Sequence, residues 1–269
     1  MNIVVFIKQV PDVPAIKIDH QRMTIIREGV DSIINPLDYV ALLCAKELKQ
    51  REGGHMTVVT MGPPQSEEAL RESLAAGADR AILLTDSYFA GADTLATSHV
   101  LASAVRRMEQ FPDLILCGMQ TVDSDTGHVG PQIAEELDLP QVCGVTEILS
   151  EGEHLLVKRL GDGFLDTVKV SIPALLTINS GFQETEHLSL GEVDKAFSEK
   201  QIVCWSRQDL GLSRDDVGFK GSATQVWRLQ KPPASKKAEI ITGSPQILTD
   251  AFVKKLEELS LVDEEDTGE

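Results

Sequence analysis

One polar, glycine-containing stretch, from Gly118 to Gly130, carries residues that could hold a ligand. It follows the apolar run 114–117, which predicts a buried strand, and it leads into a helical pattern with Pro131 in the first turn. Small residues let backbone amides approach a ligand closely, and a helix N-terminus offers free N–H groups and a positive dipole end to a phosphate. The stretch therefore predicts a phosphate site, although an ordinary solvated loop before a capped helix has a similar composition.

Four other polar junctions lie between predicted strands and helices, and they are also rich in Gly, Pro, Asn or Thr. These junctions are residues 8–12, 35–38, 61–64 and 91–98. Because the carboxyl ends of parallel strands meet at one edge of a sheet, we expect the five segments to line one crevice that binds a nucleotide. The chain contains neither GxGxxG nor GxxxxGK(S/T), so the predicted site is neither a standard dinucleotide fingerprint nor a P-loop.

The elements that must position these junctions alternate between strand and helix patterns. Apolar runs predict strands at 3–7, 56–61, 80–84 and 114–117, and helical patterns begin at Asn35, Ser66 and Asp93. This alternation predicts an α/β fold with a doubly wound, parallel, Rossmann-like sheet. Beyond Pro140 the pattern changes to short strands over 144–149, 154–159, 164–170 and 173–178, which predict a β-rich edge, and a small hairpin is predicted over 16–30.

We expect two parts in the chain, a nucleotide-binding α/β domain over 1–200 and an extended C-terminal arm over 201–269. The segment from Trp205 to Glu239 is polar and weakly patterned, which is typical of an arm and not of a packed domain. It carries an apolar cluster at 226–229, so it could pack on another chain or fold back on its own domain. A last amphipathic helix is predicted over 249–261, before an acidic tail.

The composition excludes several classes of function. The net charge of -17 argues against nucleic acid and anionic membranes as partners, because both require a basic face. None of the 4 cysteines forms a CxxC pair, and Cys44 and Cys117 fall in apolar patterns, so we expect no metal site. No Ser-His-Asp constellation is readable, and no catalytic residue is predicted. Without a basic leader or a long apolar run, we expect a cytoplasmic protein.

The chain resembles the β subunit of electron transfer flavoproteins along almost its whole length. The resemblance is carried, in order and spacing, by FIKQVPD, INPLD, TMGPPQSEEALRESLAAGADRAILL, GMQTVDSDTGHVGPQIAEELDLPQ and VKRLGDGFLDTVKVSIPALLTI. The last segment departs from the family pattern at Phe164, where an acidic residue or glycine is usual, and at Asp166, where Glu or Gln is usual.

The resemblance implies an electron carrier that is a heterodimer with an α subunit, which holds a redox FAD. The β subunit would contribute an adenine-nucleotide-binding α/β domain and an arm that embraces α. By resemblance, the cofactor-binding residues are Phe6, Asn35, Pro36, Leu37, Asp38, Met61, Gly118, Gln120, Thr121, Val122, Asp123, Ser124, Asp125, Thr126, Gly127, His128 and Val129. The phosphates would meet amides and hydroxyls of the 118–130 loop.

The family has two branches, in which the β subunit binds either structural AMP or a second, bifurcating FAD. The segments ADTLATS (92–98) and DSDTGHVGP (123–131) resemble the bifurcating branch, so we expect FAD here, with AMP as the alternative. Asp93, Thr94 and Thr97 would then join the cofactor site, although Thr94 could also be a plain helix cap. His128 could lie near a flavin or simply be exposed.

In the bifurcating reading, NADH reduces the β-subunit flavin, one electron passes to ferredoxin or flavodoxin, and the other passes through the α flavin to a dehydrogenase or quinone reductase. In the ordinary reading, electrons pass from an acyl-CoA dehydrogenase through the α flavin alone. The resemblance makes Leu190 the residue that docks a dehydrogenase, but the usual lysine-rich run after it is interrupted here by acidic residues. An adenine-nucleotide-binding regulatory protein without a redox role is the alternative from another class.

Overall fold

The computed structural model describes residues 1–12, 17–19, 24–26, 32–151, 154–179, 188–198, 201–227 and 240–259. The chain divides into two compact units, Met1–Arg228 and Leu229–Glu269, which are described separately. In the parts that the structure describes, no helix is both long enough and apolar enough to cross a lipid bilayer.

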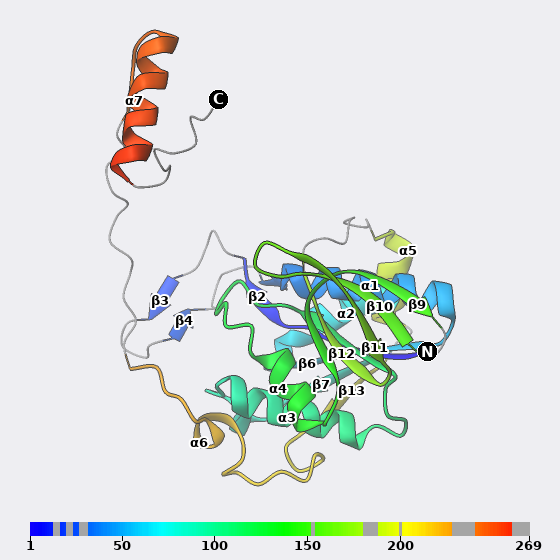
Figure 1. Ribbon diagram of the computed structural model, residues 1–269. Coiled ribbons are helices and arrows are strands. Elements are labelled where there is room, and N and C mark those ends of the chain that lie inside the picture. Colours follow the sequence, from blue (N-terminus) through cyan, green and yellow to red (C-terminus); the bar gives the residue numbers. More distant parts are fainter. Residues whose placement is uncertain are drawn as a thin grey trace. The chain divides into compact units, whose positions relative to one another are not determined.

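A sheet forms the centre of the first unit (Figure 1). It has nine strands in the order β11-β10-β9-β12-β8-β1-β6-β7-β13. Its strands are β1 (Asn2–Phe6), β6 (His55–Met61), β7 (Arg80–Leu84), β8 (Leu114–Gly118), β9 (Gln141–Glu151), β10 (His154–Leu160), β11 (Leu165–Ser171), β12 (Ala174–Ile178) and β13 (Ile202–Trp205). In the order of the sheet, every pair of neighbours from β9 through β12, β8, β1, β6 and β7 to β13 is parallel. The strand β10 pairs antiparallel with both β9 and β11. The predicted doubly wound α/β sheet with a β-rich edge is confirmed.

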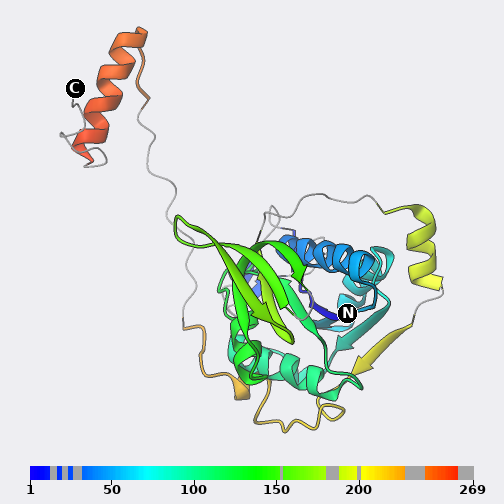
Figure 2. The ribbon, with the colours of Figure 1, turned by 45° about the vertical axis from the view of Figure 1, so that its right-hand side comes forward.

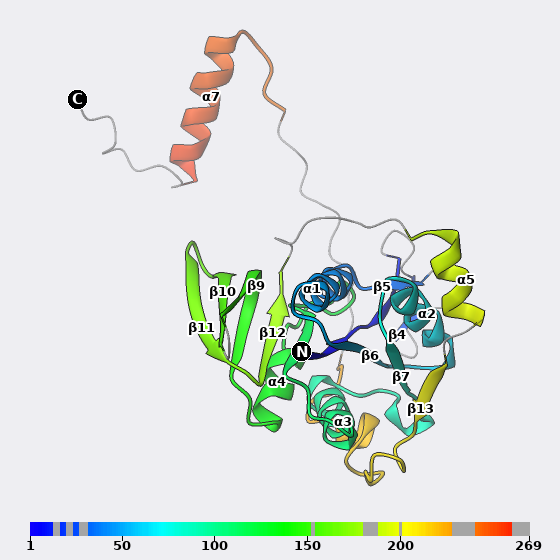
Figure 3. The same cartoon turned by 90° about the vertical axis from the view of Figure 1, so that its right-hand side faces the viewer.

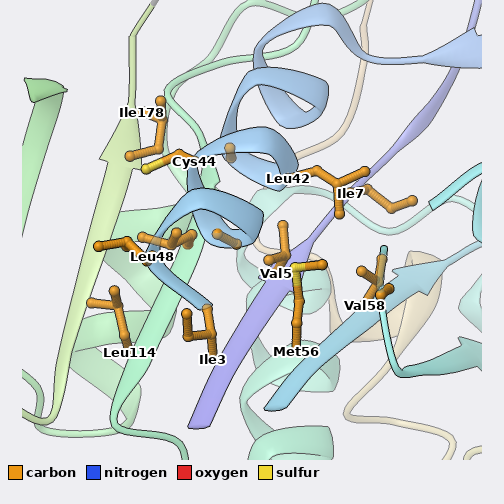
Figure 4. Packing of buried hydrophobic residues seen from close by; sticks show 14 of the residues in the cluster. Ile3, Val5, Ile7, Leu42, Cys44, Leu48, Met56, Val58, Leu114 and Ile178 are labelled. Atoms are coloured by element: carbon orange, nitrogen blue, oxygen red, sulfur yellow. The ribbon is translucent and has the colours of Figure 1, made fainter. Parts of the chain in front are cut away.

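Helices cover both faces of this sheet (Figures 2 and 3). On one face lie α1 (Pro36–Glu52), α2 (Glu67–Ala75) and α5 (Leu190–Ser198), and on the other lie α3 (Thr94–Arg107) and α4 (Val129–Glu136). Because successive side chains of a strand point to opposite faces, β1 contributes side chains to two separate hydrophobic cores, one on each face of the sheet. Ile3 and Val5 pack toward α1 (Figure 4), whereas Val4 and Phe6 join the core under α3.

The strand β13 places the boundary of the first unit later than residue 200. Trp205 ends this strand, is 8% exposed, and lies with its ring 5.1 Å from the Arg107 guanidinium carbon and 5.9 Å from that of Arg80. Beyond it, Val217 is buried in the same core as Phe89. Residues 201–227 belong to the first compact unit, and the expected division at residue 200, with an arm that embraces an α subunit, stays a prediction. A strand of four residues is too short to produce a readable periodicity.

Several short elements complete the described chain. In the region of the predicted hairpin, β3 (Lys17–Asp19) and β4 (Thr24–Ile26) pair antiparallel, and the rest of that region lies outside the described residues. The others in the first unit are β2 (Gln9–Pro11), β5 (Ser32–Ile34), η2 (Pro64–Ser66), η3 (Ser87–Phe89) and α6 (Gly218–Gly221). In the second unit α7 (Pro245–Glu258) begins four residues before the predicted helix start at 249, and Ser244 caps it. The acidic tail lies outside the described residues.

Candidate functional site

The topology creates a switch point beside β1. The chain leaves β1 through α1 to β6 on one side, and after β7 and α3 it returns to β8 on the other side of β1. In open α/β sheets, ligands bind in the crevice outside the carboxyl ends of the strands at such a point. Two segments lie at this end of the sheet, as the hydrogen bonds between them show. One is the start of α1, and the other is the segment 118–130, which runs from the last residue of β8 into the first turn of α4 and is called the 118–130 loop.

Asn35 connects the walls of this crevice. It is fully buried; its Oδ1 accepts a hydrogen bond from the Val122 N–H at 3.0 Å, and its Nδ2 donates to the Gln120 carbonyl at 2.9 Å. Its own N–H donates to the Lys8 carbonyl at 2.8 Å. Asn35 stands at the predicted N-cap position of α1, but its side chain makes no capping hydrogen bond. Both of its side-chain hydrogen bonds join it to the 118–130 loop.

Asp38 makes a second connection in the first turn of α1. Its Oδ1 accepts from the Gly118 N–H and its Oδ2 from the Lys8 N–H, each at 2.8 Å. Burial raises the pKa of Asp38 to about 7, against the lowering effect of these hydrogen bonds and of the Lys8 charge. A Cβ atom on Gly118 would lie 2.5 Å from Asp38 Oδ1, so only glycine fits there. The carboxylate therefore acts as a structural link at the floor of the crevice.

The first half of the 118–130 loop is fixed by an ion pair and a turn. Lys8 Nζ lies 2.7 Å from both carboxylate oxygens of Asp123, whose side chain is 6% exposed. The Asp125 N–H donates to the Thr121 carbonyl at 2.8 Å, with Asp125 at a φ of 54°. The Thr121 and Ser124 hydroxyls lie 2.9 Å apart. Asp123 thus faces Lys8, in agreement with a role in orienting the loop.

The second half of the loop presents unused backbone donors. The N–H groups of residues 126–130 have no hydrogen-bond acceptor anywhere in the described ranges of the chain. Gly127 has a φ of 66°, and α4 begins at Val129 with no side chain capping it. The Thr126 side chain is exposed beside these amides. A run of free amides at a helix N-terminus is a site that binds anions such as phosphate.

The segment 92–98, which was expected to join the cofactor site, contains the start of α3. The residue that caps this helix differs from one of the two alternatives given for Thr94. Asp93 is the N-cap, with Oδ1 accepting from the Ala96 N–H at 2.9 Å, so the alternative that Thr94 caps the helix is wrong. Thr94 and Thr97 are half-buried, and their hydroxyls have no hydrogen-bond partner among the residues that the structure describes. They remain available as donors at the start of α3.

Ser98 joins the two predicted loops. It is buried, and its Oγ lies 2.7 Å from the Thr94 carbonyl, 3.3 Å from the Val129 carbonyl and 3.1 Å from Gln132 Oε1. The start of α3 is therefore held directly against the start of α4. Lys8 and Ser98 lie in the junctions 8–12 and 91–98 that were expected to line the crevice, but sequence reasoning did not identify either as an individual site residue, because their partners lie far along the chain.

The remaining predicted site residues lie as follows. Phe6 is buried with its ring in the core under α3, and Met61 is half-buried at the end of β6, partly packed on that core. The side chains of Pro36, Val122 and His128 are exposed, and that of Leu37 is half-buried. Leu190, the predicted docking residue, begins α5 and is 89% exposed.

The chain is similar to known proteins over most of its length. The family model described as "Electron transfer flavoprotein domain" matches residues 22–201. The chain is 43% identical over 257 residues to the electron transfer flavoprotein subunit beta of Thermoanaerobacterium thermosaccharolyticum, covering 95% of this chain and 98% of that one. It is 42% identical to the caffeyl-CoA reductase-Etf complex subunit CarD of Acetobacterium woodii, covering 97% of this chain and all of the relative. It is 41% identical to the protein FixA of Azorhizobium caulinodans, covering 95% of this chain and 94% of the relative.

Proposed function

The chain belongs to the electron transfer flavoprotein family, among relatives named as β subunits, and from this premise we propose that it holds FAD in the crevice beside β1. In this role it pairs with an α subunit that carries a further FAD, and the two subunits transfer electrons together. The names of its relatives, which describe a subunit and an Etf complex, support the pairing.

The observation that carries the proposal is the run of free amides at residues 126–130. They lie beside the Thr126 hydroxyl at the start of α4 and suit a phosphate group. The start of α3 offers a second set of donors, the hydroxyls of Thr94 and Thr97, which Ser98 holds against α4. AMP has a single phosphate, whereas FAD has a pyrophosphate and a flavin beyond it. Two neighbouring sets of donors therefore support FAD over AMP.

When bound, FAD supplies the redox chemistry, because it can accept and release electrons singly or in pairs. The residues of this chain would bind and orient it. The amides of the 118–130 loop would hold phosphate, and Thr94 and Thr97 would donate hydrogen bonds near the flavin end. Asn35 and Asp38 fix the loop to α1, and the Lys8–Asp123 pair fixes its first half.

The partners follow from this role. We propose the bifurcating reading, in which NADH donates two electrons, ferredoxin or flavodoxin accepts one, and the α flavin passes the other to a dehydrogenase or quinone reductase. The exposed side chain of Leu190 is the proposed docking point for such a dehydrogenase. The acidic surface implied by the net charge of -17 favours partners with basic docking faces.

The decisive experiment is to co-express the chain with its α subunit and to measure the FAD and AMP extracted per complex. A Gly127→Ala variant tests the loop, because alanine strains a backbone with a φ of 66° by roughly 1–2 kcal/mol. Gly163→Ala is the matched control, since Gly163 has a φ of 78°, lies in the β10–β11 turn and has open space around it. We expect the β-site nucleotide to be lost in the Gly127 variant and kept in the control.

Two FAD and no AMP per complex would support the proposal and make the reduction of ferredoxin by NADH the next assay. One FAD and one AMP would instead make the protein an ordinary single-flavin carrier. Equal nucleotide retention in both glycine variants would refute the assignment of the 126–130 amides. A colourless protein that carries ATP would favour the non-redox, regulatory alternative.

A further inference from the structure

A segment after the last strand of the sheet is attached closely to the start of α3. This segment, residues 206–224, includes α6 and is called the strap (Figure 1). Gly218 has a φ of 58°, and a Cβ atom there would lie 1.9 Å from the Tyr88 carbonyl oxygen. The guanidinium carbon of Arg214 lies 4.5 Å from the centre of the Tyr88 ring. The strap therefore packs closely against η3.

Asp93 is the point at which the strap meets the segment 92–98. Its Oδ2 accepts from the Thr224 N–H at 2.8 Å and from the Thr224 hydroxyl at 2.9 Å. Its N–H donates to Ser222 Oγ at 2.8 Å, and Ser222 Oγ donates in turn to the Gly218 carbonyl at 2.8 Å. The other carboxylate oxygen, Oδ1, caps α3 through the Ala96 N–H. One residue thus sets the helix start and bonds to two residues of the strap.

The charge of Asp93 agrees with this arrangement. Burial alone would raise the pKa of this carboxyl, but the hydrogen bonds from Ala96 and Thr224 outweigh it and hold the pKa below its ordinary value. Asp93 is therefore ionised at neutral pH, and its hydrogen bonds to the strap are charge-assisted, which makes them stronger than those between neutral groups.

We propose that Ser222 and Thr224 are positioning residues for the Thr94–Thr97 end of the cofactor site, so that strap attachment and FAD binding stabilise each other. The inference rests on the proposed function, because it requires that Thr94 and Thr97 contact the cofactor. If Asp93 loses its strap partners, the first turn of α3 is free to shift, and the two threonine hydroxyls shift with it. A coupling of this kind is reciprocal, so FAD must also tighten the strap.

The strap is continuous with the second unit. Thr224 precedes Arg228, the last residue of the first unit, by a few residues of chain. A partner that binds the second unit is therefore connected covalently, through a short stretch of backbone, to the residues that hold the cap of α3. This gives the chain a route by which partner binding could change the retention of the cofactor.

The test uses the complex with the α subunit, from which the β-site nucleotide is removed and to which FAD is then titrated. We expect the Ser222→Ala, Thr224→Val double variant to raise the FAD dissociation constant of this site by about 5- to 50-fold. Thr224→Ser keeps the hydroxyl and should restore the affinity to within about twofold when Ser222 is intact. Ser213→Ala is the matched control, because Ser213 lies in the strap and its hydrogen bonds join it to Asp215 and Asp216 and not to Asp93.

A second measurement separates positioning from a general loss of structure. Hydrogen exchange of the strap amides should slow when FAD binds to the wild-type complex, and the slowing should be lost in the double variant. Thr94→Val is included to test the premise. If it weakens FAD binding while the double variant binds FAD as tightly as the wild type, the positioning role is refuted and the proposed function stands. If Thr94→Val has no effect, or the extracted nucleotide is AMP, the premise itself fails and the inference with it.

Discussion

Asp38 provides a quantitative test of how the crevice is held together. The residue is 5% exposed, and its two oxygens accept backbone hydrogen bonds from Gly118 and Lys8, on different segments of the chain. Burial raises its pKa from 3.8 to about 7. Replacement by asparagine keeps the size of the side chain, removes its titration and leaves one of the two backbone N–H groups without an acceptor. The loss of the hydrogen bond is independent of pH, so the change of the stability difference with pH isolates the contribution of the one proton.

The sign of the effect follows from linkage. Between about pH 4 and pH 7 the native state keeps the Asp38 proton, whereas the unfolded chain has already lost it. The unfolded state then binds fewer protons, so the free energy of unfolding falls as the pH rises through this range. From about pH 5.5 to pH 7 the loss is about 2 kcal/mol, at 1.36 kcal/mol for each pKa unit. The variant cannot show this loss.

The assay is urea-induced unfolding of the complex at about pH 5.5 and about pH 8.5, at one protein concentration, followed by circular dichroism. The lower pH stays above the sequence pI of about 4.7, which limits aggregation. We expect the stability difference between the variant and the wild type to move by about 2 kcal/mol in favour of the variant at the higher pH. Asp125→Asn, which changes an exposed carboxylate of the same loop, is the control.

A difference that is constant with pH, or that moves in favour of the wild type, would refute this reasoning. It would mean that the two amides, the start of α1 and Lys8 together hold Asp38 ionised in spite of its burial.

Two other variants test the same crevice. Gly118→Ala should destabilise the complex by about 1–3 kcal/mol, because its Cβ would lie 2.5 Å from Asp38 Oδ1, whereas Gly191→Ala, with nothing within 4 Å, should leave the melting temperature unchanged. Equal melting temperatures for the two glycine variants would contradict the close approach at Gly118. Asn35→Ala leaves the Val122 N–H and the Gln120 carbonyl without their partner, so we expect a loss of about 2–4 kcal/mol in urea unfolding and a lower nucleotide content. The exposed Gln65→Ala is its control, and a loss no larger than that of the control would show that Asn35 does not hold the loop.

The sheet could be predicted from the sequence because its central strands are buried on both faces. Ile3–Ile7 reads as an uninterrupted apolar run for that reason, and the same is true of Leu114–Cys117. The paired strands 144–149 and 154–159 were readable from their own patterns, and β9 and β10 confirm them. The strand β13 was missed because four residues at the edge of a sheet leave too little pattern.

The arrangement of the site could be predicted only in part, since local patterns do not reveal distant partners. Asn35 and Asp38 have the types expected at a helix start, but their side chains bond to residues that lie far along the chain. Asp93 was expected beside the cofactor, and its bonds to the strap could not be read from the sequence. The list of cofactor-binding residues stays a prediction, which the nucleotide measurement tests.

The long-range contacts that close the crevice have a consequence for how the protein is made. The Gly118–Asp38 bond joins residues 80 positions apart, the Val122–Asn35 bond 87, and the Lys8–Asp123 pair 115. Closing such long loops costs entropy, so we expect these contacts to form after shorter-range packing such as that of α1 on β1. During synthesis, the domain can therefore begin to fold while the crevice does not yet exist. Insertion of the cofactor must wait until the ribosome has released the chain beyond the start of α4, which makes it a late step in maturation.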